Sequence, residues 1–327
     1  MDKQRLLVSP APHLKSDETV AMAMRDTMLA LLPVTLTAVY FFRIYAVFLI
    51  FVCMGTAAVT EIVFRRLHQQ PHRLSDGSAL LTGLLVALCF SATTAWWKGA
   101  LATMIAVGVA KEMMGGLGWN RFNPALFGRV SMILLAPWFV DIGSEFMRWN
   151  IHFGPVDVMT HATPLAMLHQ GLELPGIWSL FIGFPGGAMG EVSPLALVIG
   201  GLFLLYRGHI NWRIPVSILV TVFVLAAIAG HNPFLHMVTG GLMLGAFFMA
   251  TDWVTSPITE KGKYVFGVAI GVLIVLFRIG LAPTEGVAFS ILIMNAFVPR
   301  IEKITRRVPF SEPKDKSVQR MPASLKY

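Results

Sequence analysis

Charged residues are scarce in this sequence. Lys, Arg, Asp and Glu make up 13% of its 327 residues, whereas hydrophobic residues make up 55%. The mean hydropathy is +0.67. Soluble proteins carry about 25% charged residues, so this composition excludes a soluble or a disordered chain. It predicts an integral membrane protein with most of its residues in the bilayer.

Cysteines are also few, and the common catalytic motifs are missing. The two cysteines, Cys53 and Cys89, lie in apolar runs without CxxC spacing, so we interpret them as packing residues. The chain has no G-x-G-x-x-G, Walker, HExxH or G-x-S-x-G motif. It is therefore not expected to bind NAD or to hold an iron–sulfur cluster. The net charge of +8 is interpreted as a mark of cytoplasmic loops rather than of nucleic-acid binding.

Runs with few charged residues predict the membrane spans. They cover residues 27–42, 44–60, 77–97, 99–110, 122–140, 192–206, about 264–281 and 285–299. Residues 214–251 carry no Asp, Glu, Lys or Arg. Because this stretch is too long for one helix, we divide it into two spans at Gly230–Pro233. The count is ten, with nine or eleven as alternatives, and several runs need polar flanks to reach about 20 residues.

Basic residues alternate from loop to loop. They gather after the second, fourth, sixth and eighth spans and in the C-terminal tail: Arg65, Arg66, Arg73, Lys111, Arg121, Arg207, Arg213, Lys261, Lys263, Arg300, Lys303, Arg306 and Arg307. The long loop 141–191 has Arg148 as its only Lys or Arg. By the positive-inside rule, both termini are expected in the cytoplasm and loop 141–191 outside, which means the periplasm of a Gram-negative host.

Two Asn-Pro segments predict helix starts. Residues 116–128 contain Asn123-Pro124, and residues 229–236 contain Asn232-Pro233. Asn caps free N–H groups, and Pro at the first helical position loses no bond. Residues 78–85 and 193–201 form a second similar pair. Both pairings shift the chain by three spans, which inverts the orientation as an inverted repeat requires. The alternative is that Asn-Pro is only a common helix opener.

Few polar groups lie inside the expected spans. Arg129 and Arg278 are the only charges well inside them. An intramembrane Arg contacts a ligand, or it snorkels to the interface or pairs with a nearby carboxylate, and these interpretations stay open. In inverted repeats, helix N-termini point at polar or anionic groups, so Asn123, Asn232 and Arg129 are candidate binding residues. These features alone also fit a small-solute channel or a secondary transporter.

The outer loop contains one distinctive motif, Asp157-x-x-Thr160-x-Ala162-Thr163, followed by Pro164 and Leu165. Its residue types predict a turn into a short helix, with Thr163 as N-cap and Pro164 in the first position. The motif also resembles the site at which a flavin transferase attaches FMN through a phosphoester to the last Thr. The usual Gly is replaced here by His161, while the acceptor hydroxyl is kept.

Further segments carry the same resemblance in the expected order: residues 76–83, 116–125, 190–196 and 250–259. Over residues 20–300 the chain resembles the family that contains the D-type subunit of Rnf electron-transport complexes and the B-type subunit of the sodium-pumping NADH:quinone reductase. The short N-terminal segment favours the Rnf type.

The resemblance implies an all-α polytopic membrane protein with two inverted five-helix repeats. The expected parts are a cytoplasmic segment 1–26, repeats 27–140 and 192–299, the periplasmic loop 141–191 and a basic cytoplasmic tail 300–327. The resemblance further implies covalent FMN on Thr163 and a second, non-covalent riboflavin. The chain would then belong to a bacterial inner-membrane complex that moves electrons between ferredoxin and NAD and couples this to Na+ or H+ transport. Expected partners are the other Rnf subunits (A, B, C, E and G), a flavin transferase and membrane lipid, and not nucleic acid.

Overall fold

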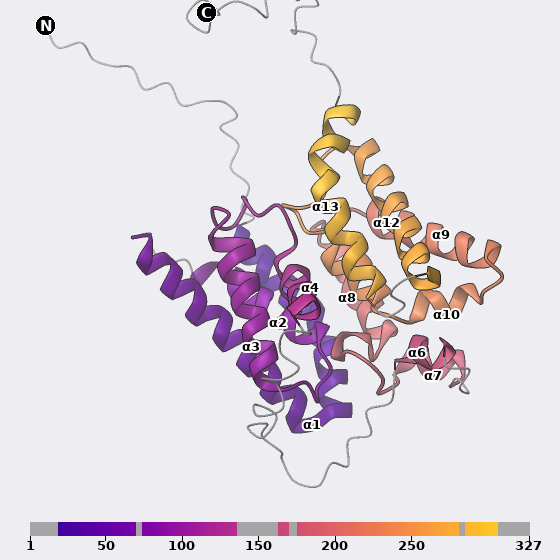
Figure 1. Ribbon diagram of the computed structural model, residues 1–327, viewed down its shortest axis with the longest axis horizontal. Helices are drawn as coiled ribbons and strands as arrows, with labels where there is room; N and C mark the ends of the chain where they lie inside the picture. The colour runs from indigo at the N-terminus through magenta and orange to yellow at the C-terminus, as the bar shows by residue number, and fades with distance from the viewer. Residues whose placement is uncertain (1–18, 70–73, 136–162, 170–174, 281–284, 307–327) are drawn as a thin grey trace, which may run out of the picture.

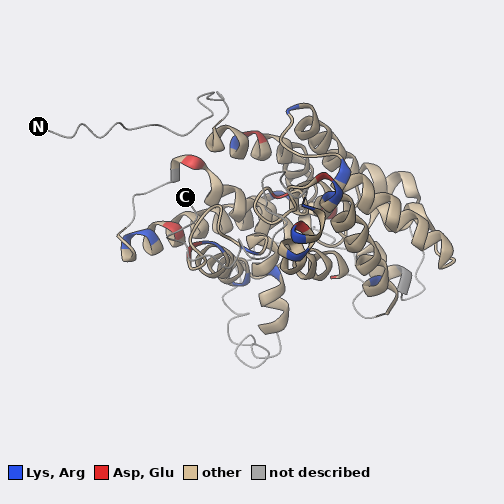
Figure 2. Cartoon of the chain, turned by 90° about the horizontal axis from the view of Figure 1, so that it is seen from above, with Lys and Arg blue, Asp and Glu red and all other residues tan. Residues whose placement is uncertain are grey.

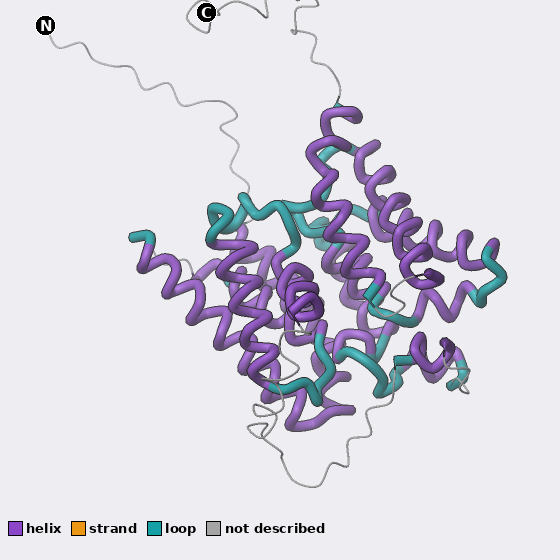
Figure 3. The backbone as a smooth tube through the Cα atoms, viewed as in Figure 1, coloured by secondary structure: helices purple, strands orange, loops and turns teal. Residues whose placement is uncertain are grey.

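The computed structural model describes residues 19–69, 74–135, 163–169, 175–280 and 285–306. Within these ranges the chain is helical and contains no extended β-strand (Figures 1 and 3). The all-α prediction is therefore confirmed for the part that the structure describes.

The first helix, α1 (Val20–Leu67), consists of two arms joined by a sharp reversal. Thr19 caps its start by accepting a hydrogen bond from the N–H of Met22. Arg43 has non-helical angles (φ 51°, ψ −130°) and separates the arms. At 1.5 Å per residue each arm is roughly 35 Å long, enough to cross the hydrocarbon core of a bilayer. The charge at position 43 therefore marks the reversal between two expected spans.

Three helices follow α1 before the first gap in the described residues. They are α2 (Ser78–Cys89), preceded by the short turn η1 (Leu74–Asp76), then α3 (Trp96–Met104) and α4 (Pro124–Leu135). The π-helical segment η2 (Ile105–Glu112) continues α3 without interruption. α4 starts at the expected Asn-Pro pair, where Asn123 Oδ1 accepts a hydrogen bond from the N–H of Leu126.

The remaining elements form the second part of the chain. They are α6 (Pro164–His169), α7 (Ile177–Ile182), η5 (Met189–Glu191), α8 (Pro194–Tyr206), α9 (Arg213–Ile228), α10 (Pro233–Val238), α11 (Leu242–Leu244), the π-helical η6 (Gly245–Met249), α12 (Glu260–Gly280) and α13 (Gly286–Thr305). Ser193 caps α8, and Asn232 caps α10 at the second Asn-Pro pair.

One apolar core joins the two parts. α1 packs against α2, α3 and α8, while α12 packs against α9 and α13. Close helix contact depends on glycine: a Cβ placed on Gly200 of α8 would collide with the backbone oxygen of Ala30 in α1. Cys53 and Cys89 are buried free thiols within this core, as their interpretation as packing residues predicts.

The outer surfaces of the helices are apolar. Figure 2 shows long stretches of helix without a charged residue and several charges near the middle of the view. By length and composition, α1 and α12 are the described helices that could cross a membrane; α2, α4, α8 and α9 are shorter and apolar.

Candidate functional site

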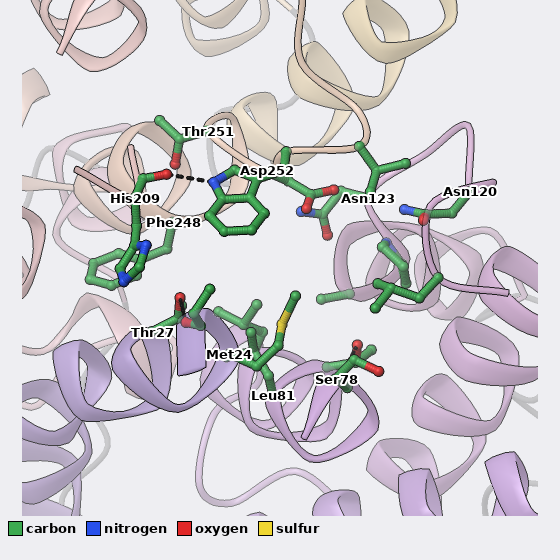
Figure 4. Close-up of a pocket in the computed structure, with 18 of the residues that line it drawn as sticks. Met24, Thr27, Ser78, Leu81, Asn120, Asn123, His209, Phe248, Thr251 and Asp252 are labelled. Carbon is green, nitrogen blue, oxygen red and sulfur yellow. Dashed lines mark hydrogen bonds between the residues drawn. The ribbon is translucent and has the colours of Figure 1, made fainter. Parts of the chain in front are cut away.

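A polar-lined cavity of about 340 Å³ lies where the two parts of the chain meet. Ligand pockets in proteins begin at roughly 300 Å³. Figure 4 shows its walls: Asn120 and Asn123 on one side, His209, Phe248 and Thr251 on the other, Asp252 between them, and Met24, Thr27, Ser78 and Leu81 below. Residues from α1, α2, the loop before α4, η6 and the loop after it thus meet around one space.

The two asparagines before α4 form a polar wall that is already partly satisfied. Asn123 is buried, caps α4 and donates from Nδ2 to the carbonyl of Met249 at 3.2 Å. Asn120 is also buried and donates to the carbonyl of Phe122, whereas its Oδ1 has no hydrogen-bond partner among the described residues. A buried unpaired amide oxygen is costly, so this wall offers an acceptor to a ligand with N–H or O–H donors.

A carboxyl group also lines the cavity. Asp252 accepts a hydrogen bond from Thr255 Oγ1 at 2.9 Å. Burial raises the pKa of the Asp252 carboxyl, and the hydrogen bond from Thr255 opposes that rise. Nearby, the buried His209 contacts Asp26 Oδ2 through Nε2 at 2.9 Å, and its carbonyl accepts from Trp253 Nε1. The cavity therefore combines a large apolar lining with a few fixed polar groups.

Thr163 begins helix α6, as the motif predicts. Its Oγ1 accepts a hydrogen bond from the N–H of Ala166 at 3.1 Å, and its carbonyl accepts from the N–H of Met167 at 2.9 Å. Pro164 occupies the first helical position, and Leu165 is fully buried. Because Leu165 anchors the helix while Thr163 stays partly exposed, the hydroxyl is held in a defined place at the surface of the bundle.

The surroundings of Thr163 contain a carboxyl group with one buried oxygen atom, that of Glu191. A Cβ on Gly187 (φ +83°) would lie 2.6 Å from Thr163 Cγ2 and 2.9 Å from Glu191 Oε2. Glu191 Oε2 has no hydrogen-bond partner among the described residues. On the other side, a Cβ on Gly240 would meet both Leu165 and the Arg278 guanidinium. Thr163, Glu191 and Arg278 are thus gathered around two glycines that let the backbones approach.

A second, much smaller cavity of about 30 Å³ lies beside this group. Arg129 on its wall makes a two-fold ion pair with Glu285, with Nε–Oε2 at 2.8 Å and Nη2–Oε1 at 2.6 Å. Arg278 is buried and donates to the carbonyls of His236, Thr239 and Gly240 at the end of α10. Arg129 is therefore paired with a carboxylate, as one of the open interpretations predicts, whereas Arg278 bonds to backbone carbonyls, which none of them predicted.

The structure places the sequence-predicted residues in three groups. Asn123 lines the large cavity, and Arg129 lines the small one. Thr163, Pro164 and Leu165 form the start of α6. Asn232 is exposed and lines neither cavity. Asp157, Thr160 and Ala162 lie outside the described residues, so their role stays a prediction.

Several residues at these sites were not singled out from the sequence. They are Asn120, His209 and Asp252 at the large cavity, and Glu191 beside Thr163. Asn120, Glu191 and Asp252 lie inside segments that carry the family resemblance, which was the available signal. His209 had none, because its contact with Asp26 joins positions 183 residues apart.

Comparison with known proteins agrees with the resemblance. The model of the NQR2, RnfD, RnfE family matches residues 7–311. The chain belongs to this family. It is 39% identical to the D subunit of the Na(+)-translocating ferredoxin:NAD(+) oxidoreductase complex of Acetobacterium woodii, over 94% of this chain and 95% of that protein.

Two more relatives are also similar to this chain over most of its length. The D subunit of the proton-translocating ferredoxin:NAD(+) oxidoreductase complex of Clostridium ljungdahlii is 39% identical, over 94% of this chain and 97% of its own. The D subunit of the ion-translocating oxidoreductase complex of Stutzerimonas stutzeri is 36% identical, over 88% and 91%. Relatives of equal identity are named for different ions, so overall identity in this family does not select Na+ or H+.

Proposed function

We propose that this chain is the subunit of an ion-translocating ferredoxin:NAD oxidoreductase that carries two flavins, FMN on Thr163 and riboflavin in the 340 Å³ cavity. The observation that carries the proposal is that one chain of this family combines a capped, partly exposed Thr163 with a separate ligand-sized cavity. Family membership favours electron transport over the channel or transporter alternative. Bound flavins supply one-electron chemistry, and the chain's residues hold them in place.

The residues around Thr163 fit a phosphoester-linked FMN. The N–H of Ala166 already points at Oγ1, and free N–H groups at a helix start favour a phosphate. The guanidinium of Arg278 lies close to Leu165 across Gly240 and adds positive charge. Arg129 contributes a second guanidinium that Glu285 neutralises. The chain would thus retain the cofactor by a covalent bond and offset its charge with α6 and Arg278.

The residues of the large cavity fit an uncharged flavin. Its lining is mainly apolar, as a flat aromatic ring requires, and Phe248 and Trp253 are among the lining residues. Asn120 Oδ1 supplies an unused acceptor, and Asn123 and Asp252 supply further polar groups. Riboflavin carries no phosphate and so needs no cluster of arginines.

We infer that the helices form two halves of five helices each, which cross the membrane in inverted orientations. The arms of α1, α2, α3 with η2, and α4 would form the first half. The second half would comprise α8, α9, α10 with α11 and η6, α12 and α13. Both halves contain a short helix that follows a left-handed glycine, Gly77 before α2 (φ +74°) and Gly241 before α11 (φ +66°). Both also contain a π-helical segment.

This arrangement puts α6 and the large cavity on opposite sides of a bacterial inner membrane. Figure 1 places α6 and α7 at the end away from the start of α1 and the end of α13. With both termini in the cytoplasm, Thr163 would face the periplasm, where an exported flavin transferase reaches it. The other Rnf subunits (A, B, C, E and G) would surround the apolar outer faces together with lipid.

The covalent flavin is tested by fluorescence of the band on a denaturing gel. The full chain is expressed with a flavin transferase, beside Thr163→Ala and Thr163→Ser variants. We expect a fluorescent wild-type band, a dark Ala band and residual signal for Ser, which keeps a hydroxyl. A dark wild-type band, with the transferase active on a known acceptor, would refute covalent FMN. Fluorescence in all three would move the attachment to another residue.

The riboflavin site is tested by a pair of asparagine variants. Asn123→Ala removes a cavity residue, while Asn232→Ala removes an exposed residue from the other Asn-Pro helix start. Flavin released by acid from the purified complex is identified by chromatography. We expect Asn123→Ala to lose most of the riboflavin and Asn232→Ala to keep it. Equal riboflavin in both variants, or loss only with Asn232→Ala, would refute the cavity as its site.

Membrane orientation is tested by cysteine labelling, because both native cysteines are buried. Lys263→Cys near the start of α12 and Lys98→Cys near the start of α3 are treated with an impermeant maleimide in sealed spheroplasts. We expect labelling at position 98 only. The reverse pattern would invert the proposed topology.

A further inference from the structure

Four charged residues with buried side chains form a cluster at the wall of the large cavity. Glu61 and Arg65 come from α1, and Lys111 and Glu112 come from the end of η2. Glu61 accepts hydrogen bonds from Arg65 Nε at 3.1 Å and from Lys111 Nζ at 3.0 Å. Arg65 and Lys111 also lie within 3.6 Å and 3.9 Å of Glu112 Oε1. Two acidic and two basic side chains thus balance one another out of contact with solvent.

Lys111 connects this cluster to the cavity. Its side chain is 2% exposed, and its Nζ donates to Ser78 Oγ at 2.7 Å. Both Lys111 and Ser78 line the cavity, and Lys111 is the only Lys or Arg among its lining residues. Ser78 in turn is bonded to Asp76, which fixes the hydroxyl that orients the ammonium. The ammonium is therefore held at the cavity wall by two oxygen atoms, one from α1 and one from α2.

The π-helical turns of η2 explain how a lysine reaches this place. Lys111 is the seventh of the eight residues of η2, and Gly108 in the same segment packs against Phe64 of α1. A wider turn shifts the following side chains around the helix axis, and such turns recur at functional sites. Burying a lysine is costly without partners, so a purely apolar wall would be simpler if this ammonium had no function.

The Lys111 ammonium stabilises the two redox states of a bound ring to different extents. An oxidised, neutral ring gains little from a nearby cation. A ring that has accepted one electron without a proton carries a negative charge, and a desolvated cation stabilises it strongly. Asp252 is the only Asp or Glu among the lining residues, and burial makes its neutral form easier to reach. Lys111 is thus the main positive charge available to a reduced ring.

We propose that Lys111 stabilises the reduced form of the ring bound in the large cavity and thereby raises its reduction potential, with Glu61 limiting that effect. In this step one electron arrives from a low-potential one-electron donor of the complex. The ring gains one negative charge, no bond forms or breaks, and Lys111 keeps its proton. The proposal rests on the proposed riboflavin site, which it deepens by naming the residue that sets the potential.

The experiment uses the full chain in lipid nanodiscs, in a Thr163→Ala background so that no covalent flavin contributes. Riboflavin is added, and its affinity in the oxidised state and its midpoint potential are measured for each variant. Lys111→Gln removes the positive charge, Lys111→Arg keeps it, and Glu61→Gln removes the opposing carboxylate. Lys303→Gln makes the same charge change on the exposed side of α13 and is the matched control.

We expect opposite shifts from the two members of the ion pair. Lys111→Gln lowers the potential, with the affinity for the reduced ring falling about tenfold more than that for the oxidised ring. Glu61→Gln raises the potential, while Lys111→Arg and Lys303→Gln leave it near the wild-type value. Glu61→Gln keeps Lys111, so it tests the proposal even if Lys111→Gln does not fold.

Two results overturn the proposal while leaving the riboflavin site intact. One is a wild-type potential in Lys111→Gln with riboflavin bound. The other is a shift of the same sign in Lys111→Gln and Glu61→Gln, which indicates general damage to the cavity. Failure of the background protein to bind riboflavin at all would instead refute the proposed site, and the inference with it.

Discussion

The ion pair between Arg129 and Glu285 is expected to hold the two parts of the chain together. The residues are 156 positions apart, on α4 and at the start of α13, and their side chains are 17% and 22% exposed. Two unit charges about 4 Å apart attract by about 4 kcal/mol at an effective dielectric constant of 20. Desolvation offsets part of this, so we expect a coupling energy of about 2 kcal/mol between the two sites.

Arg129→Gln should lower the free energy of unfolding more than Glu285→Gln does. Arg129→Gln leaves Glu285 without its ion-pair partner on the wall of the small cavity, which Glu191 also lines, so two carboxyl groups share that cavity without the Arg129 charge. Glu285→Gln leaves Arg129 with Glu191 still nearby. We expect Arg129→Gln to lower the free energy of unfolding by about 3–4 kcal/mol and Glu285→Gln by about 2–3 kcal/mol.

The assay is reversible unfolding by SDS in mixed micelles, followed by circular dichroism. It compares wild type, both single variants and the double variant, from which the coupling energy is calculated. A coupling energy below about 0.5 kcal/mol would refute the role of this pair. A larger loss in Glu285→Gln than in Arg129→Gln would refute the argument from Glu191.

Three further predictions concern packing and buried hydrogen bonds. Gly200→Ala should lower the free energy of unfolding by about 1–3 kcal/mol or more, because its Cβ collides with the backbone of α1; Gly55→Ala, with open space around it, should not destabilise in the same SDS titration. Asp26→Asn should cost about 2 kcal/mol, because the bond to His209 loses its charged acceptor; an unchanged thermal midpoint would contradict this. Arg278→Lys should lower the thermal midpoint, since a single ammonium does not reproduce a guanidinium fork on three carbonyls; a wild-type midpoint would argue against it.

Local signals in the sequence predicted local structure well. Asn123, Asn232 and Thr163 each cap the helix that their patterns predicted, because capping depends on a few adjacent atoms. The separation of two apolar runs at Arg43 also agrees with the reversal in α1. Composition predicted a membrane protein, and the family resemblance supplied the all-α class that the described residues confirm.

Contacts between distant segments were not predictable in the same way. Glu285 and Arg129 were both visible in the sequence, but nothing local pairs positions 156 residues apart. The same holds for Lys111 with Glu61, and for Asp26 with His209. The π-helical turns of η2 and η6 leave no simple hydrophobic period, so the direction of Lys111 followed only from the fold. The cavity, which takes residues from both parts of the chain, could not be assembled from motifs alone.

The difference between the two cavities bears on why one flavin would be covalent. If the halves are inverted repeats, Lys111 beside Ser78 and Arg278 beside Gly240 occupy related places, each against a short helix that begins after a left-handed glycine. The large cavity has room for a ring. The small one, of about 30 Å³, has its wall formed in part by the Arg129–Glu285 pair. Thr163 itself is partly exposed at the start of α6. A flavin there would rest against the protein rather than inside it, and a phosphoester at Thr163 would prevent its loss where burial does not.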